Sequence, residues 1–369
     1  MPNPNAEVSI VIRMDLPAGR SPAEELRAGR GVSVELESGR RARLDPADQR
    51  SVGFARILDT LSKDRLLAYL EIDPESSTIT GVFIPRLTRV LAINPLDEGL
   101  VVRLARSHAP HVLRRGSPDF DELEPRLREA LRTGDTVILT ENADYDIIDV
   151  RYATGPGDSK GLTRAPLTAK LVEPKKPWWS YLIPWLTCAS SAKAQQVFDT
   201  MSATTCDPVT VSAPCIPFLY PKDGCFARAH EMCRLMINMG LKPGKVWIEG
   251  NLHVETKNSP TCQVVWDWHV APTLCVRGSR FLQTEELVID PALFETPVSK
   301  ETWKGKQGDP NATLKDTGVA IYFDAEITDI SSDMLDPNYV DSNQDLIYYR
   351  ARLVEQTEVY GPAPYACPP

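Results

Sequence analysis

Apolar and polar residues recur along the first half of the chain with two spacings, one typical of helices and one typical of strands. A helix followed by two strands is predicted twice, at 48–62 with 66–72 and 78–84, and at 120–132 with 135–140 and 144–151. A turn at Asp73-Pro74-Glu75 separates the first strand pair. The shared order indicates a diverged internal repeat. This half carries no catalytic arrangement, and His108 and His111 are predicted to lie on its surface.

The clearest helical pattern of the second half begins at Cys225. Apolar residues follow it at helical spacing as far as Gly240, while charged residues fall on the other faces. Asp223 is expected to cap this helix, and Gly224 allows a tight turn before it. A helix N-terminus carries unpaired N–H groups and a partial positive charge, which favour a thiolate and can hold an oxyanion. Cys225 is therefore the candidate nucleophile.

Two strands supply the other candidate groups. Over 262–271 the alternation predicts two faces, with Val264, Trp266, Trp268 and Val270 on one and Asp267, His269 and Ala271 on the other. A second strand at 287–290 ends before Pro291, so Asp290 sits at a strand terminus. Cys225, His269 and Asp290 thus occur in the order of a nucleophile, a base and a group that orients the base.

Asp267 is the alternative third member, because it precedes His269 by two residues on the same strand face. Side chains at this spacing stand nearly parallel, so an in-line hydrogen bond to the imidazole is harder to make than from a neighbouring strand. Asp290 is therefore preferred. Asp267 is interpreted as a solvated or substrate-facing carboxylate.

The remaining histidines of this half, His230 and His253, are interpreted first as structural residues. A zinc site needs three or four converging ligands, and Cys225, His230 and Cys233 lack the paired spacing of zinc motifs. No metal and no cofactor are expected.

Composition limits the class of protein. A chain of 369 residues with 42% hydrophobic residues is expected to form two domains with packed cores. The formal net charge of −9, without a basic patch interleaved with aromatic residues, argues against nucleic acid as a partner. No apolar run reaches transmembrane length, so no membrane partner is expected. Residues 1–7 lack the charged and apolar regions of a secretory signal.

Cysteine occurs only in the second half, where all eight lie between Cys188 and Cys367. Cys206 and Cys215 bracket a short loop at a spacing suited to a local disulfide. Between the halves, 153–177 is rich in Gly, Pro and Lys, which predicts an exposed linker open to proteolysis. The apolar cluster after it is interpreted as packing between domains rather than as a membrane wedge; it comprises Trp178, Trp179, Tyr181 and Trp185.

Four separated motifs surround the candidate residues: Asp-Gly-Cys-Phe-Ala-Arg-Ala-His-Glu-Met at 223–232, Gly-Asn-Leu at 250–252, Trp-Asp-Trp-His-Val-Ala at 266–271 and Ile-Asp-Pro-Ala-Leu-Phe at 289–294. In this order they resemble the bacterial protein-glutaminase family, protein deamidases with a papain- and transglutaminase-like core. The resemblance covers 196–345 and implies that Cys225, His269 and Asp290 take the catalytic positions. Cys206 and Cys215 match paired positions of secreted relatives, which implies an ancestry in an oxidising compartment.

The resemblance implies an α+β fold in which the nucleophile helix packs on an antiparallel sheet. The expected divisions are an N-terminal α+β domain at 1–152, a linker with the Trp-rich cluster at 153–195, a protein-glutaminase-like catalytic domain at 196–345 and a C-terminal tail at 346–369. Residues 44–90 resemble the pro-region of secreted protein-glutaminases. A regulatory N-terminal domain that docks on the catalytic domain is therefore expected, with an unrelated binding domain as the alternative.

The activity implied is hydrolytic deamidation of glutamine side chains in proteins or peptides, through a thioester of Cys225. Peptide-bond cleavage and transglutaminase-type acyl transfer share this acyl-enzyme and remain alternatives. A binding module with relic triad residues is a third alternative, which the intact Cys225, His269 and Asp290 set disfavours. Without a signal, the chain is expected in the cytoplasm or exported by a signal-independent route, or secreted if a leader was removed.

Overall fold

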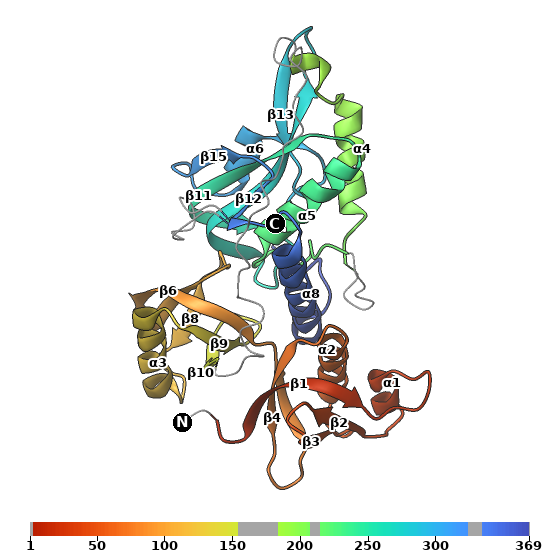
Figure 1. The fold of residues 1–369 in the computed structure, drawn as a ribbon, viewed down its shortest axis with the longest axis vertical. Helices are drawn as coiled ribbons and strands as arrows, with labels where there is room; N and C mark the ends of the chain where they lie inside the picture. Colours follow the sequence, from red (N-terminus) through yellow and green to blue (C-terminus); the bar gives the residue numbers. More distant parts are fainter. Residues whose placement is uncertain (1–2, 154–183, 207–214, 324–333, 369) are drawn as a thin grey trace. The chain divides into compact units, whose positions relative to one another are not determined.

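The computed structural model describes residues 3–153, 184–206, 215–323 and 334–368 (Figure 1). They pack as two compact units: unit 1 comprises Met1–Arg106, Pro110–Thr163 and Arg350–Pro362, and unit 2 comprises Ser107–Ala109, Arg164–Tyr349 and Ala363–Pro369. Both units combine helices with antiparallel sheets, which confirms the α+β class. Of the expected linker at 153–195, residues 154–183 lie outside the described residues, Trp178, Trp179 and Tyr181 among them. The domain limits expected at 152, 195 and 345 stay predictions.

The first sheet of unit 1 has the strand order β3-β2-β1-β4-β5. Its elements are β1 (Ala6–Met14), α1 (Pro22–Arg27), β2 (Val32–Leu36), β3 (Arg41–Leu44), α2 (Ser51–Lys63), β4 (Leu67–Ile72) and β5 (Ile79–Phe83). In β2, Val32, Val34 and Leu36 are buried while the residues between them are partly exposed, as expected for a strand with one face on a core.

The second sheet of unit 1 has the order β8-β7-β6-β9-β10. Its elements are β6 (Arg86–Leu96), β7 (Gly99–Leu104), β8 (His111–Arg114), α3 (Phe120–Thr133), β9 (Thr136–Glu141) and β10 (Ile147–Tyr152). In both sheets the first strand is central, and a helix joins the third strand to the fourth. The predicted groups are therefore α2-β4-β5 and α3-β9-β10, and the common strand order supports the internal repeat.

Unit 2 is built on a sheet of order β14-β13-β12-β11-β15. Its elements are η2 (Pro184–Leu186), α4 (Ser191–Ser202), α5 (Cys225–Asn238), β11 (Pro243–Glu255), β12 (Gln263–Arg277), β13 (Thr284–Val288), β14 (Val298–Ser299), α6 (Lys300–Lys306) and β15 (Thr313–Thr317). A small pair, β16 (Ile321–Phe323) and β17 (Met334–Leu335), is followed by α8 (Val340–Tyr360). Residues 346–360, expected in a tail, thus form the larger part of a helix.

Two apolar clusters hold the helices of unit 2 to its sheet. In one, Met232 and Met236 of α5 pack with α4 and with Leu274 and Val276 near the end of β12. In the other, β11 and the first half of β12 pack with Trp303 of α6. Because α5 is anchored by its later turns, its first residue is fixed against the middle of β12.

Three disulfides cross-link unit 2: Cys188–Cys275, Cys206–Cys215 and Cys262–Cys367. The local pair Cys206–Cys215 agrees with the sequence prediction, and the other two join segments 87 and 105 residues apart. Cys225 and Cys233 remain as free thiols. Among the described residues, no helix combines the length and the apolar character needed to cross a membrane.

Candidate active site

Cys225 is the first residue of α5, and Gly224, rather than the expected Asp223, is the residue that caps the helix. Gly224 adopts φ +80°, and a Cβ at this position would lie 2.4 Å from the Cδ2 atom of Tyr349. The backbone conformation and the packing therefore both require glycine. The Asp223 carboxylate accepts instead from the Gly224 N–H at 2.7 Å, and the Arg228 side chain donates to the Asp223 carbonyl at 2.6 Å. These bonds fix the turn that presents Cys225.

His269 and Asp290 are joined by a hydrogen bond in the interior of unit 2. The Nε2 atom of His269 lies 2.9 Å from Oδ2 of Asp290, and the Nε1–H of Trp303 donates to the same oxygen at 2.9 Å. Asp267 is exposed on β12. Because Asp290 is the acid that contacts the imidazole, geometry favours it over Asp267, and the catalytic roles stay a prediction.

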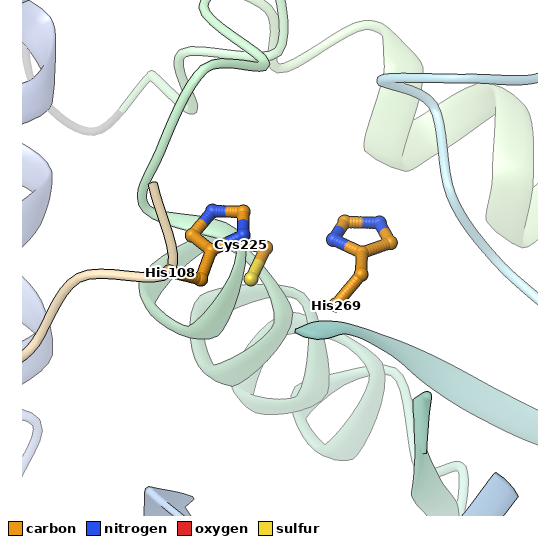
Figure 2. A group of neighbouring side chains, drawn as sticks. All are labelled: His108, Cys225 and His269. Atoms are coloured by element: carbon orange, nitrogen blue, oxygen red, sulfur yellow. The ribbon is translucent and has the colours of Figure 1, made fainter. Parts of the chain in front are cut away.

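Figure 2 shows one ring nitrogen of His269 turned toward Cys225. A carboxylate can only accept, so Nε2 of His269 carries the proton shared with Asp290, and Nδ1 presents a lone pair. The sulfur of Cys225 lies within 4.8 Å of the nearest imidazole ligand atom of His269. The structure thus brings together the three residues that the sequence predicted as a triad.

The alternation predicted for β12 holds in its burial, with Trp266 buried and Asp267 exposed, but it does not account for every contact of Trp266. Its ring stacks on the imidazole of His269, with centroids 4.5 Å apart and planes 18° apart, although the alternation placed the two on opposite faces. The pairing of β11 with β12 shifts register between Glu249 and Leu252, opposite Trp266 and Trp268, and the extra residue lies on β11. Trp303 also stacks on His269, at 5.5 Å. Neither contact was predicted from the sequence.

Burial, rather than the helix terminus, dominates the electrostatics of Cys225. The thiol is 1% exposed, and burial raises its pKa above the usual value, although Arg228 and the Val270 N–H act in the opposite direction. The expectation of a stabilised thiolate is therefore wrong for this conformation. Burial likewise lowers the pKa of His269 against the opposing effect of Asp290. The described state pairs a neutral thiol with a neutral imidazole.

Asp290 remains ionised in the same environment. Burial acts to raise the pKa of its carboxyl group, but the hydrogen bonds from His269 and Trp303 outweigh that effect, and the net pKa lies below the usual value. A buried carboxylate with two donors on one oxygen is suited to orient the imidazole and to stabilise its protonated form.

His108 is buried, which corrects the prediction that it lies on the surface. It is 1% exposed and belongs to unit 2 with its neighbours Ser107 and Ala109. Its Nδ1 lies 2.9 Å from the carbonyl oxygen of Trp268. The Ser107 hydroxyl donates to Asp223 at 2.7 Å, and the His108 backbone N–H donates to the same carboxylate at 3.3 Å. These partners lie more than 100 positions away, so the sequence could not indicate them.

His108 lies beside Cys225, on the opposite side of the thiol from His269 (Figure 2). Burial lowers the pKa of His108 to about 3, with Asp223 opposing the shift, so its imidazole is neutral near pH 7. His111, also predicted at the surface, is buried within unit 1, where its Nδ1 lies 2.6 Å from Oε2 of Glu141.

His230 has the structural role that the sequence suggested. Its Nε2 lies 3.0 Å from the carbonyl oxygen of Asp336, and the amine of Lys245 lies 2.9 Å from its Nδ1. Both ring nitrogens are therefore engaged within the protein. His253 is exposed on β11, away from this cluster.

Comparison with known proteins gives the following matches. Residues 194–307 match a family model described as Glutaminase. A crystal structure of pro-protein-glutaminase is 24% identical, with 73% of this chain and 93% of that chain covered and a TM-score of 0.50. A crystal structure of protein-glutaminase is 30% identical, with 42% of this chain and 86% of that chain covered and a TM-score of 0.36. The NMR structure of protein-glutaminase from Chryseobacterium proteolyticum is also 30% identical, with 42% and 84% covered and a TM-score of 0.37. Comparison with curated protein sequences gave no match.

The segment that matches the Glutaminase model contains Cys225, His269 and Asp290. The protein-glutaminase that is 30% identical to this chain is covered over 86% of its own length. With the hydrogen-bonded His269–Asp290 pair beside a helix-start thiol, these matches show that the chain belongs to the protein-glutaminase family.

Proposed function

We propose that this protein hydrolyses the side-chain amide of glutamine in protein substrates, giving glutamate and ammonia, with Cys225 as nucleophile. The observation that carries the proposal is the buried Cys225–His269–Asp290 arrangement inside the segment that matches the Glutaminase family. The names of the relatives state the same activity on proteins.

The neutral thiol and imidazole define the first step. Nδ1 of His269 takes the thiol proton as the Cys225 sulfur attacks the amide carbon, and Asp290 stabilises the imidazolium that forms. Backbone N–H groups in the first turn of α5 are available to hold the oxyanion. His269 then returns the proton to the departing ammonia, and water hydrolyses the thioester.

Incubation of a glutamine-containing protein with the enzyme tests the reaction. We expect free ammonia, together with the mass increase of amide-to-acid conversion at glutamine residues of the intact substrate. New N-termini would identify a peptidase, and incorporation of an added amine would identify a transamidase, because the acyl-enzyme is common to all three activities. The Cys225→Ala variant should release no ammonia, while Cys233→Ala controls for the second free thiol.

We also propose that the N-terminal half regulates the site by docking on the catalytic domain. Its support is that Ser107–Ala109 packs with unit 2 although the chain on either side belongs to unit 1. We call these three residues the cover segment. A ring nitrogen of its His108 lies within 4.8 Å of the buried Cys225 sulfur, so displacement of the segment should admit both water and substrate.

Limited proteolysis tests this regulation, because the Gly-, Pro- and Lys-rich stretch 153–177 is the expected cleavage region. Cleavage there should increase both ammonia release and the rate at which iodoacetamide modifies Cys225. If neither rate changes, the N-terminal half is better interpreted as a docking module for a substrate.

The three disulfides further support folding in an oxidising compartment, which mass spectrometry of the protein isolated without reduction would test.

A further inference from the structure

Three potential metal ligands converge at Cys225. One ligand atom each from His108, Cys225 and His269 lies within 4.8 Å of the other two, and each residue is 1% exposed. Figure 2 shows the thiol between the two imidazoles. His108 comes from the cover segment, Cys225 from the start of α5 and His269 from β12, so the cluster joins three separate parts of unit 2.

The hydrogen-bond arrangement leaves more acceptors than donors in this cluster. Nδ1 of His108 faces a carbonyl oxygen, and Nε2 of His269 faces a carboxylate, so both of these nitrogens must carry hydrogen. The lone pairs therefore reside on Nε2 of His108 and Nδ1 of His269. Among the described residues, neither atom has a hydrogen-bond partner, and Oδ1 of Asp223, which also can only accept, lies 3.4 Å from Nε2 of His108. The single S–H of Cys225 can satisfy one of them at most, and the other stays buried and unpaired.

A metal cation satisfies all three groups at once. Histidines that bind metals donate their other ring N–H to a carboxylate or a backbone carbonyl, which fixes the tautomer and the ring orientation. His269 donates in this way to Asp290, and His108 donates to the Trp268 carbonyl. Asp223 in turn holds the backbone N–H of His108 and the hydroxyl of Ser107. Both outer supports of a two-histidine site are therefore built into the fold.

We propose that the full-length protein binds one zinc ion through Nε2 of His108, Sγ of Cys225 and Nδ1 of His269, and that the ion ties the cover segment to the nucleophile. A thiolate with two imidazoles is a ligand set that zinc accepts, with water in the fourth position. Binding forms a Zn–S bond, and the thiol proton leaves to solvent. Tetrahedral zinc requires ligand atoms about 3.3 to 3.6 Å apart, given Zn–N and Zn–S bonds of about 2.0 and 2.3 Å. The three ligand atoms lie within 4.8 Å of one another, so binding requires the side chains to move closer together.

Cobalt(II) is the probe for the ligand set, because it occupies zinc sites and absorbs according to its ligands. Titration of the full-length protein, purified without thiol reductants, should reach one equivalent. It should show sulfur-to-cobalt charge-transfer absorption together with tetrahedral visible bands, and one equivalent of zinc should abolish both. His108→Ala and Cys225→Ala should each weaken binding at least about 100-fold, since each removes a direct ligand.

Matched variants separate this site from other possible ligands. Cys233→Ala removes the other free thiol, and His253→Ala removes an exposed histidine of β11, so both should titrate like the unaltered protein. His108→Phe keeps a ring against Trp266 and Trp268, which lie 5.1 Å from the His108 ring, and it should lose binding while unfolding at a similar temperature. Loss of binding in a folded His108→Phe variant therefore reports the ligand and not the fold.

The inhibitory consequence rests on the proposed function, whereas metal binding does not. Zinc should slow iodoacetamide modification of Cys225 in the full-length protein at least about tenfold, and a chelator should restore the rate. Failure to bind cobalt, or a charge-transfer band that survives His108→Phe, overturns the metal site. The protein could bind zinc as described and still release no ammonia after chelation and cleavage. That result would support the metal site and refute the proposed function.

Discussion

Asp290→Asn tests the proposed third member of the triad, because it removes a charge and keeps the shape of the side chain. Oδ2 of Asp290 accepts from His269 and Trp303, each at 2.9 Å. An amide oxygen in the same place can still accept both bonds, so the variant should fold. The substitution removes the negative charge beside the imidazolium that forms when His269 takes the thiol proton.

Two unit charges 4 Å apart attract by about 4 kcal/mol at an effective dielectric constant of 20, and an amide dipole keeps only part of that attraction. We therefore expect the transition state to lose about 2 to 4 kcal/mol of stabilisation, which corresponds to roughly 30- to 1000-fold in kcat/KM. Asp267 is exposed on the strand that carries His269. Asp267→Asn should change kcat/KM by less than about threefold, as expected for a surface substitution.

The assay is ammonia release from a glutamine-containing protein, measured after the proteolytic treatment that gives maximal activity. Thermal unfolding of each variant serves as the control for the fold. An Asp290→Asn variant with unaltered kcat/KM, or an Asp267→Asn variant that loses more, would refute the assignment of the orienting role to Asp290.

Three further predictions concern stability. Gly224→Ala should destabilise unit 2 by more than about 1 kcal/mol in chemical denaturation, because it combines a positive φ with a clash against Tyr349; an unchanged midpoint would contradict the packing described. Replacing both Cys262 and Cys367 by serine should cost about 2 to 4 kcal/mol, since their disulfide closes a long loop, and an equal unfolding midpoint would show that the cross-link is not needed. Burial lowers the pKa of Lys245 to about 8, so between pH 8 and its unfolded value of 10.5 the unfolded chain binds more protons, and the free energy of unfolding should rise with pH. The rise attributable to this lysine is at most about 3 kcal/mol, and a Lys245→Met variant that rises equally would exclude it.

The sequence alone predicted those helices and strands whose formation depends on the local spacing of apolar residues. The helix that starts at Cys225 and both helix-then-hairpin groups of the first half follow from periodicity, and their observed limits differ from the predicted ones by at most three residues. The sequence also predicted Cys225, His269 and Asp290 as a triad, because each residue occupies an identifiable position in a predicted helix or strand. The hydrogen bond between His269 and Asp290 then agrees with the preference for an acid from outside the histidine strand.

The features that periodicity missed depend on tertiary contacts. His108 stands in a Pro-containing stretch that reads as a surface loop, and its burial depends on Asp223 and Trp268, more than 100 residues away. The ring of Trp266 stacks on His269 three residues later on the same strand, a contact that strand alternation does not predict. The raised pKa of Cys225 was also missed, since desolvation by surrounding groups outweighs the local effect of the helix terminus.

The repeated strand order of unit 1 bears on how the regulation of this enzyme can change. The turn between β2 and β3 spans residues 37–40, whereas its counterpart between β7 and β8 spans residues 105–110 and includes the cover segment. Insertions at a hairpin tip leave the paired strands and their cores intact. A duplicated module thus allows one copy to keep a short turn while the other acquires a segment that reaches the nucleophile. Exchanging these two turns would test the proposed regulation while leaving the strands of both sheets unaltered.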